Sequence, residues 1–552
     1  MIRADIIRLY KTVHSWTGIS CGLALFIAFY AGALTMFKEP IARWASPPSI
    51  GVEQLALKDA PRLIDQVLAA HPAAREEGIT LHLKAHEGLP ARLTWAEERP
   101  HDEDDPGHHH EYVHWWATLD TDGTLLARQE TPSGLAQFID DIHQRVGIPG
   151  RTGSHFMGVV TLLYGVALIS GVIILLPSLV KDFFAFRVGR NLKRMWLDAH
   201  NIVGITGLPF HIVMAVTAMA FSFGGIFFMI QETVVYGGKQ AVVGRQFSAQ
   251  FGQPEPTGEA APMLPPVQLL ERMRAHAPDF EADALIIERP GDEAAVARFE
   301  GREPGYVMDS KYSEVVLSAV TGEVVNDRLR PSRQSPWWRT TMTIAGLHYG
   351  QYAGAFMAWA YFVLGLAGAW LFYSGNLLWI ETRRSKARKG REVTQSRSTR
   401  FMGSATVGVC LGSVAGISLT MVAAKWLHGR VADPDHWHEY IYYVVFLGAV
   451  AWAFARGAAR SAVTLLWLCA AATMAIPLTS LLALLNPGWG PWAHGSAATI
   501  GVDMMAGVGA LCFAWMAIAT ARRIRNGPAD SIWHVGTDGK AAALAHGPLR
   551  TE

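Results

Sequence analysis

The sequence predicts a mainly α, polytopic membrane protein with about eight transmembrane helices. Half of the 552 residues are hydrophobic and only 17% are charged, which is too apolar for a water-soluble chain of this length. Apolar runs of roughly 20 residues, the length that crosses a bilayer, recur along the chain. They lie near residues 14–37, 155–177, 199–224, 345–373, 402–424, 439–456, 461–485 and 499–521.

Basic segments between the apolar runs predict their orientation. These segments are residues 3–11, 181–194, 383–391, 456–460 and 522–525, and all of them fall on one side of the predicted membrane. Since positively charged loops stay in the cytoplasm, both termini are expected inside a bacterial inner membrane and the polar inserts in the periplasm. A formal charge of +1 gives no sign of nucleic-acid binding. The four cysteines lie in apolar segments without a CxxC pair, so no disulfide, zinc or iron–sulfur site is indicated.

These features divide the chain into eight parts. We expect transmembrane helices in residues 1–37, 151–224 (two helices and a basic loop), 341–380 and 401–521 (four helices). The remaining parts are a first insert at 38–150, a second at 225–340, a basic loop at 381–400 and a cytoplasmic tail at 522–552.

The first 380 residues repeat a pattern of helix, insert and helix. YKTVHSWTGIS (10–20) and WLDAHNIVGIT (196–206) each place a histidine four residues before a glycine at the start of a helix. The predicted returns to the membrane also match, as DDIHQRVGIPG (140–150) and AGLHYGQYAG (345–354).

Both inserts have the same expected order of elements. An amphipathic helix ends in AAHP (69–72) or AHAP (275–278), and alternating strands follow. Each insert then has a hairpin, with Asp-Gly or Thr-Gly as its turn, at residues 116–129 and 315–328. We therefore expect two small α+β domains inserted in a duplicated four-helix core.

This set of motifs resembles the PepSY-associated transmembrane family. The resemblance covers the four-helix core and both inserts, and residues from about 400 onward depart from it. It implies PepSY-like periplasmic domains and, for some members, a siderophore-iron reductase of the inner membrane that binds b-type haem. The expected substrate is then a ferric chelate.

The histidines of the repeat are candidate haem ligands. On a straight helix, His200 and His211 would lie about 16 Å apart and within about 20° of the same face. Neutral imidazole is a good axial ligand for haem iron, so two such residues would suit two stacked haems. His14 and His200, which both begin helices at the cytoplasmic edge, are expected to hold an inner haem.

An outer haem is most simply held by His211 with His348, with His143 or His155 as the substitute. The alternative is that His211 forms a hydrogen bond to a neighbouring helix and His200 sits at the interface. Nearby glycines would admit a macrocycle or another helix equally well. They are Gly18, Gly147, Gly204, Gly350 and Gly354.

Other polar clusters in the sequence each allow two interpretations. HDEDDPGHHHEYVH (101–114) could bind a divalent metal through His108, His109 and His110, or be a solvated loop. The same two interpretations, a metal site or a solvated loop, apply to DPDHWHEY (433–440). Asp503, early in the last helix, could serve ion or proton movement or lie at the water boundary.

The absence of nucleotide motifs restricts the source of electrons. Without a GxGxxG turn or a P-loop, and with short cytoplasmic loops, the chain is not expected to bind NADH or a flavin. Electrons would come from quinol or a separate reductase. The expected function is a ferric-siderophore reductase that binds haem b, with two haems expected. No separate catalytic residue is assigned. A metal or siderophore transporter, or a non-enzymatic sensor or assembly protein, is the alternative.

Overall fold

The structure is a computed structural model that describes the residues in the following ranges. They are 3–48, 55–84, 91–98, 112–130, 132–179, 192–230, 233–234, 237–238, 256–307, 313–350, 352–385, 395–528 and 530–534. Two compact units make up the chain. A helical unit comprises Met1–Pro47, Ser133–Ser222 and Trp359–Glu552, and a sheet unit comprises Pro48–Pro132 and Phe223–Ala358.

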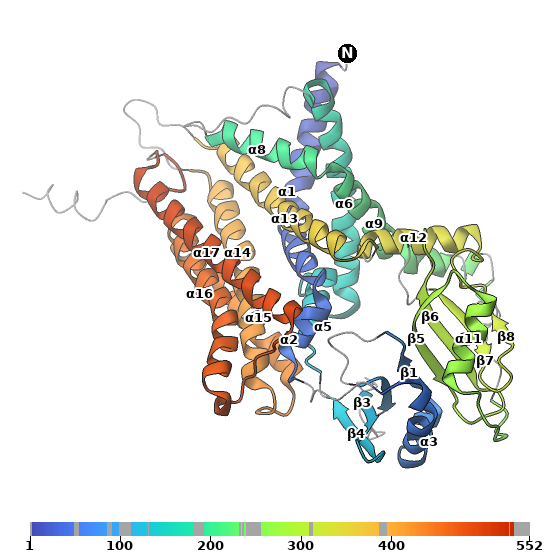
Figure 1. The fold of residues 1–552 in the computed structure, drawn as a ribbon. Coiled ribbons are helices and arrows are strands. Elements are labelled where there is room, and N and C mark those ends of the chain that lie inside the picture. Colours follow the sequence, from blue (N-terminus) through green and yellow to red (C-terminus); the bar gives the residue numbers. More distant parts are fainter. Residues whose placement is uncertain are drawn as a thin grey trace, which may run out of the picture. The chain divides into compact units, whose positions relative to one another are not determined.

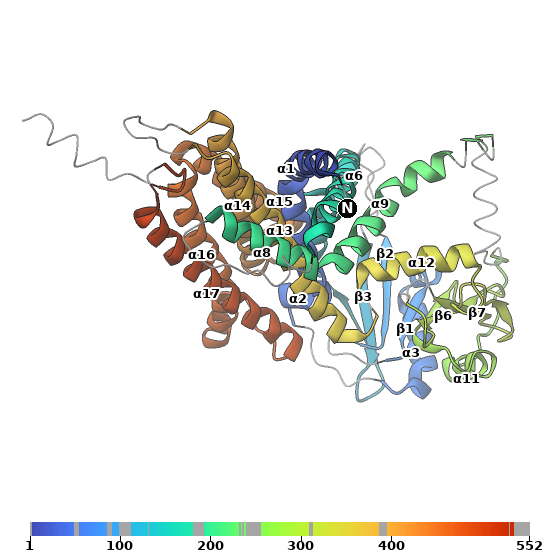
Figure 2. The ribbon, with the colours of Figure 1, turned by 90° about the horizontal axis from the view of Figure 1, so that it is seen from above.

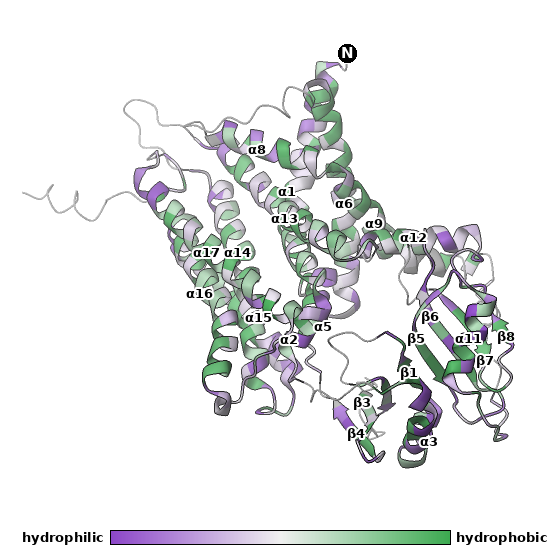
Figure 3. Cartoon of the chain, viewed as in Figure 1, coloured by the Kyte–Doolittle hydropathy of each residue, from purple (hydrophilic) through white to green (hydrophobic). Residues whose placement is uncertain are grey.

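The expected membrane spans are present. Among the described residues, seven helices are long and apolar enough to cross a membrane, and one bent pair of helices makes a further candidate. Hydrophobic residues dominate helices such as α6 (Gly150–Leu175) and α9 (Leu208–Ile230) (Figure 3). The seven are α1 (Ala4–Thr35), α6 (Gly150–Leu175, continued to Ser178 by a 3₁₀ turn), α13 (Gly354–Thr382), α14 (Arg397–Leu427), α15 (Pro434–Arg456), α16 (Ala458–Leu485) and α17 (Ala497–Asn526).

The helical unit has two groups of long helices. The four C-terminal helices α14 to α17 pack on one another, while α1 packs along α6 and also touches α14 (Figures 1 and 2). Two short helices, α2 (Lys38–Ala45) and α5 (Leu135–Arg145), lie against this bundle and contact each other. Residues 38–47 and 133–150, which the sequence assigned to the first insert, therefore belong to the helical unit.

The third predicted span is broken. Helix α8 (Leu192–Thr206) and helix α9 (Leu208–Ile230) meet at Gly207 with a bend of 69° between their axes. Pro209 has no N–H to continue the helical ladder, and glycine lowers the stability of a continuous helix at this position. The prediction that His200 and His211 share one face assumed a straight helix, and it is wrong.

The histidine motifs that precede spans two and four lie on separate short helices. Helix α5 ends where Val146 and Gly147 take positive φ angles of 48° and 79°, before α6 begins. In the sheet unit, α12 (Pro336–Tyr349) ends at Gly350, whose φ is 64°. The fourth span thus begins at Gly354 instead of residue 345, because the left-handed backbone at Gly350 stops the preceding helix.

One antiparallel sheet of eight strands forms the centre of the sheet unit (Figure 1). The strand order is β4-β3-β2-β1-β5-β6-β7-β8, so the two inserts contribute four strands each. The strands are β1 (Ile79–His82), β2 (Leu93–Glu98), β3 (Tyr112–Leu119), β4 (Leu125–Glu130), β5 (Glu281–Glu288), β6 (Val296–Arg302), β7 (Glu314–Ser318) and β8 (Val324–Asn326). The two predicted hairpins are β3–β4 and β7–β8.

The two inserts share one core and are not separate domains. Strand β1 pairs with β5, which places Ile79 opposite Ile287 and Leu81 opposite Leu285, and all four side chains are buried. Helices α3 (Ala60–Ala70) and α11 (Pro266–His276) supply residues to the same hydrophobic cluster. The short helix α4 (Ala74–Glu77) leads into β1. Pairing β1 with β5 satisfies the backbone groups that two separate sheets would each leave on an edge strand.

Candidate functional site

His14 and His200 come together in the helical unit. His14 lies on α1 and His200 on α8, and their ring centroids are 6.3 Å apart with an angle of 75° between the ring planes. A metal–imidazole bond is about 2 Å long, so two imidazoles that share one ion have ring centres about 6 Å apart. The predicted inner pair is thus close enough to hold a single iron from two sides.

Each of these two rings is oriented by a hydrogen bond at Nδ1. His14 Nδ1 lies 2.8 Å from the carbonyl oxygen of Ala167 on α6, and a carbonyl only accepts, so Nδ1 carries the proton. His200 Nδ1 lies 3.3 Å from Ser374 Oγ, which itself donates to the carbonyl of Leu371. His200 Nδ1 therefore donates as well. Both rings then present an unprotonated Nε2, which is the form that binds a metal.

Glycines on the neighbouring helices face these rings. A Cβ on Gly171 of α6 would lie 3.0 Å from His14 Cε1, and a Cβ on Gly375 of α13 would lie 3.4 Å from His200 Cε1. The absence of side chains lets these two helices approach the imidazoles closely. Two glycines expected near the haem from the sequence have more space, because a Cβ on Gly18 would meet no atom within 4 Å and a Cβ on Gly204 would meet only Leu371, at 3.8 Å.

His143 is held near the other end of α1. Its Nδ1 donates to the carbonyl of Ala28, 2.7 Å away, because a carbonyl oxygen has no proton to give. A Cβ on Gly32 would lie only 2.6 Å from the same nitrogen, so the ring occupies space that any other residue would fill. The Nδ1–H tautomer again leaves Nε2 in the form that binds a metal.

His211 lies in an aromatic environment. It is 2% exposed, and its Nδ1 is 2.8 Å from the hydroxyl of Tyr164 on α6. The rings of Phe29, Phe210 and Phe372 surround it at centroid distances between 5.7 and 6.3 Å. This arrangement matches the alternative in which His211 bonds to a neighbouring helix, and its role as a ligand stays a prediction.

The remaining histidines are less informative. His348 lies on α12 in the sheet unit, so its predicted pairing with His211 in the helical unit stays a prediction. His155 lies on α6 and is exposed. The cluster of His108, His109 and His110 lies outside the described residues. Within the part of the chain that the structure describes, no group of three or more His, Cys, Asp or Glu side chains is arranged to hold a metal ion.

Sequence reasoning missed a buried charged residue in the C-terminal bundle. Lys425 on α14 is 1% exposed, and its Nζ donates to Ser480 Oγ and to the carbonyl of Trp492, both at 3.1 Å. Ser480 and the indole of Trp44 donate in turn to Asp503, at 3.0 and 2.9 Å. The sequence contains a signal for this residue, because Lys425 directly follows the apolar run at residues 402–424.

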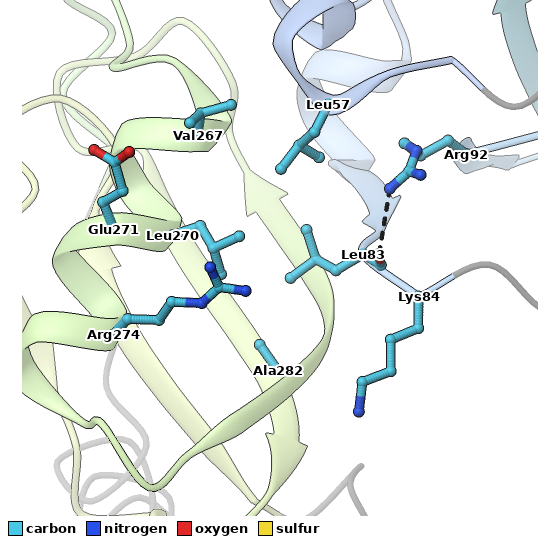
Figure 4. A pocket seen from close by; sticks show the side chains of 9 residues that line it. All are labelled: Leu57, Leu83, Lys84, Arg92, Val267, Leu270, Glu271, Arg274 and Ala282. Carbon is cyan, nitrogen blue, oxygen red and sulfur yellow. Dashed lines mark hydrogen bonds between the residues drawn. The ribbon is translucent and has the colours of Figure 1, made fainter.

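A pocket of about 440 Å³ lies on the sheet unit between α11 and the ends of strands β1, β2 and β5 (Figure 4). Its lining combines aliphatic with basic side chains, and Arg92 donates to the carbonyl of Leu83, 3.3 Å away. Lys84 is paired with Asp283 at 2.6 Å, so the charge of this lysine is compensated. The lining residues are Leu57, Leu83, Lys84, Arg92, Val267, Leu270, Glu271, Arg274 and Ala282.

The residues around His14 and His200 fit a haem iron held between two imidazoles. The ring spacing, the Nδ1–H tautomers and the nearby glycines are the observations that support this fit. Histidine is a common axial ligand of b-type haem, and a second hydrogen bond at Nδ1 is the usual way to fix such a ligand. The region around His211 carries no comparable pair among the described residues.

The fold and these residues define a polytopic membrane protein with paired histidines between its helices and a large antiparallel sheet inserted in its chain. The chain belongs to the family described as the PepSY-associated TM region, whose model matches residues 11–382. An uncharacterized protein of Pseudomonas aeruginosa, PA4219, is 26% identical over 290 residues, which are 51% of this chain and 69% of that protein. Helices α14 to α17 lie beyond the matched residues.

Proposed function

We propose that this protein is a haem-containing reductase of the bacterial inner membrane that delivers electrons to ferric iron, chelated by a siderophore, in the periplasm. The observation that carries the proposal is the pairing of His14 and His200, with ring centroids 6.3 Å apart and both Nδ1 atoms engaged. Strongly polar side chains are costly in lipid unless they are paired. A pair of imidazoles within a bundle of membrane helices is therefore a candidate functional site by default.

In this proposal the chain's own residues hold and orient the group. His14 and His200 would hold the haem iron, the carbonyl of Ala167 and the hydroxyl of Ser374 fix their tautomers, and the helix backbones at Gly171 and Gly375 approach the rings. Haem iron, when bound, supplies one-electron redox chemistry. His143, with its Nδ1 bonded to Ala28, is a candidate ligand for a second haem nearer the other end of α1.

The direction of electron flow rests on the distribution of charge. The basic segments favour a topology with the termini in the cytoplasm and the sheet unit in the periplasm. With no nucleotide-binding motif in the sequence, quinol or a separate reductase is the proposed electron donor. Each electron converts one Fe³⁺ to Fe²⁺, which hard anionic oxygen ligands hold less strongly, so reduction releases the metal.

Reconstituted vesicles test this function. Purified protein is placed in liposomes that contain dithionite, external reductant is removed, and a ferric hydroxamate chelate with ferrozine is added outside. The proposal predicts formation of the Fe²⁺–ferrozine complex well above that of protein-free vesicles, with loss of this activity in His200→Ala and retention in His155→Ala. A wild-type rate no greater than that of empty vesicles would contradict it.

A transporter of metal or metal chelate is the second candidate, and the observation that favours it is the buried charge of Lys425, which Ser480 links to Asp503. It predicts uptake of radiolabelled iron into vesicles that hold no reductant. That uptake would be reduced in Lys425→Met and Asp503→Asn and unaffected in His200→Ala. The reductase predicts the opposite dependence on these residues.

A further inference from the structure

Helix α15 of the C-terminal bundle holds the N-terminus of α5. Gly134 is the N-cap of α5, and its backbone N–H donates to Asp435 Oδ1, 3.2 Å away. The first N–H groups of a helix have no partner within the helix, and a carboxylate that accepts from them also interacts favourably with the helix dipole. A Cβ on Gly134 would lie 2.5 Å from both carboxylate oxygens, so the contact requires glycine here.

The same helix also holds the C-terminus of α5. Tyr443 Oη donates to the carbonyl of Gly147, 2.7 Å away, just beyond the left-handed residue Val146 that ends α5. Tyr442 also packs against this turn, as shown by the short distance of 3.3 Å between its ring and the position that a Cβ on Gly147 would take. Between the two ends, Phe138 of α5 contacts Tyr442 edge-on at a centroid distance of 5.7 Å.

Helix α2 gives α5 a second support from the same bundle. Lys38 donates to Asp140 and to Gln137 of α5, both at 2.7 Å. Helix α2 is itself tied to α16 and α17 through the indole of Trp44, which donates to Ser480 and Asp503. The C-terminal helices therefore restrain α5 directly and through its neighbour.

We propose that Asp435 and Tyr443 are positioning residues that hold His143 in place for haem binding. His143 lies on α5, and its bond to Ala28 depends on how this helix sits against α1. The inference rests on the proposed function, and it gives a role to α15, which lies outside the residues that the family model matches. The four-helix core alone leaves both ends of α5 without these partners.

Hydrogen–deuterium exchange on the full chain in nanodiscs tests the restraint without reference to haem. Asp435→Ala/Tyr443→Phe is compared with the matched control Glu439→Gln/Tyr440→Phe, which changes exposed residues of the same helix. Loss of one hydrogen bond at each end is expected to speed exchange of the α5 amides about fivefold or more. Unchanged exchange in α5 would overturn the proposal.

A potentiometric haem titration of the same variants tests the positioning itself. The double variant should keep its haem but shift the midpoint potential of the component that His143→Ala removes, leaving the component that needs His14 and His200 unchanged. The single variant Asp435→Glu, with Tyr443 intact, keeps a carboxylate that can accept from the Gly134 N–H. Its midpoint potential should equal that of the wild type. Faster exchange without a change in potential would overturn the proposal.

The two proposals fail in different ways. If His143→Ala retains all the haem while His14→Ala loses part, the positioning role is wrong and the reductase stands. A wild-type protein that is colourless when expressed with ample haem removes both.

Discussion

His14 on α1 and His200 on α8 meet edge to face with their ring centroids 6.3 Å apart, although 186 positions of sequence separate them. Each ring is fixed by a hydrogen bond of its Nδ1 to a further helix. The carbonyl of Ala167 on α6 fixes His14, and the hydroxyl of Ser374 on α13 fixes His200. All four helices of the repeated core thus contribute to one imidazole pair. This pair is the basis of the proposed function.

Substitution of the two ligands should not be additive. His14→Ala and His200→Ala are each expected to remove the same haem, which is about half of the total if two haems bind. The double variant should lose no more than either single variant, because both residues serve one iron. Pyridine haemochrome quantification measures the loss.

His155→Ala is the control for this experiment, since His155 is an exposed residue on α6. It should leave the haem content unchanged. Independent and additive losses in His14→Ala and His200→Ala would mean that the two residues do not share an iron.

Gly32→Ala should displace His143. The new Cβ would lie 2.6 Å from His143 Nδ1, a distance that real Cβ contacts do not show, so the bond to Ala28 must lengthen or break. Overpacking of this kind typically costs about 1–3 kcal/mol of stability. Thermal unfolding in detergent measures the effect.

Gly507→Ala on α17 is the matched control, because no atom lies within 4 Å of its Cβ position. Alanine has the higher helix propensity by about 1 kcal/mol, so this variant should be neutral or slightly stabilised. Equal behaviour of the two variants would show that His143 does not pack on Gly32 as described.

Lys425 and Asp503 should be energetically coupled through Ser480 and Trp44. Removing one member of this partly buried network leaves hydrogen-bonding groups without a partner, so Lys425→Met and Asp503→Asn are each expected to cost about 2 kcal/mol. The double variant should cost less than the sum by about 1 kcal/mol. A double-mutant cycle from SDS unfolding measures the coupling.

The exposed pair Arg3 and Asp5 provides the comparison. Their side chains are 78% and 62% exposed, so Arg3→Met and Asp5→Asn should show no measurable coupling. A Lys425–Asp503 coupling as small as that of the surface pair would contradict the account of this hydrogen-bond network.

Acid should weaken the sheet unit through Asp292. Its carboxylate accepts hydrogen bonds from the backbone of Ala294 and from Thr257 and Gly258, which lower its pKa from 3.8 to about 2. Because the pKa is lower in the folded state, the stabilisation is fully present above pH about 4 and is lost as the pH falls towards 2.

Asp292→Asn should therefore weaken the unit at neutral pH and reduce its loss of stability between pH 4 and 2. Asp279→Asn, on an exposed turn of the same insert, should leave this acid response unchanged. Limited proteolysis of the sheet unit across this pH range measures both, and identical acid responses of wild type and Asp292→Asn would contradict the assignment.

Local patterns predicted most of the elements and the inner pair of histidines. Hairpins, amphipathic helices and apolar spans depend on neighbouring residues, and His14 and His200 occupy equivalent positions in the repeat. Pro209 and Gly207 lie close together in the sequence, and the third span breaks there with a bend of 69°. This break removed the same-face relationship of His200 and His211.

Long-range relationships were not predictable from the sequence. Nothing local shows that β1 would pair with β5 to join two inserts in one sheet, because either strand could also form an edge. In the same way, the hydrogen bonds of Lys425 reach residues more than 50 positions away, and the contacts of Asp435 and Tyr443 with α5 join distant parts of the chain. Such contacts depend on tertiary packing.

The most direct measurement is a reduced-minus-oxidised absorbance spectrum of the purified protein and of His14→Ala, His200→Ala and His143→Ala. The account predicts a b-type haem spectrum that loses one component when either His14 or His200 is replaced and a different component when His143 is replaced. A wild-type protein without a haem spectrum, after expression with ample haem, would contradict the central claim.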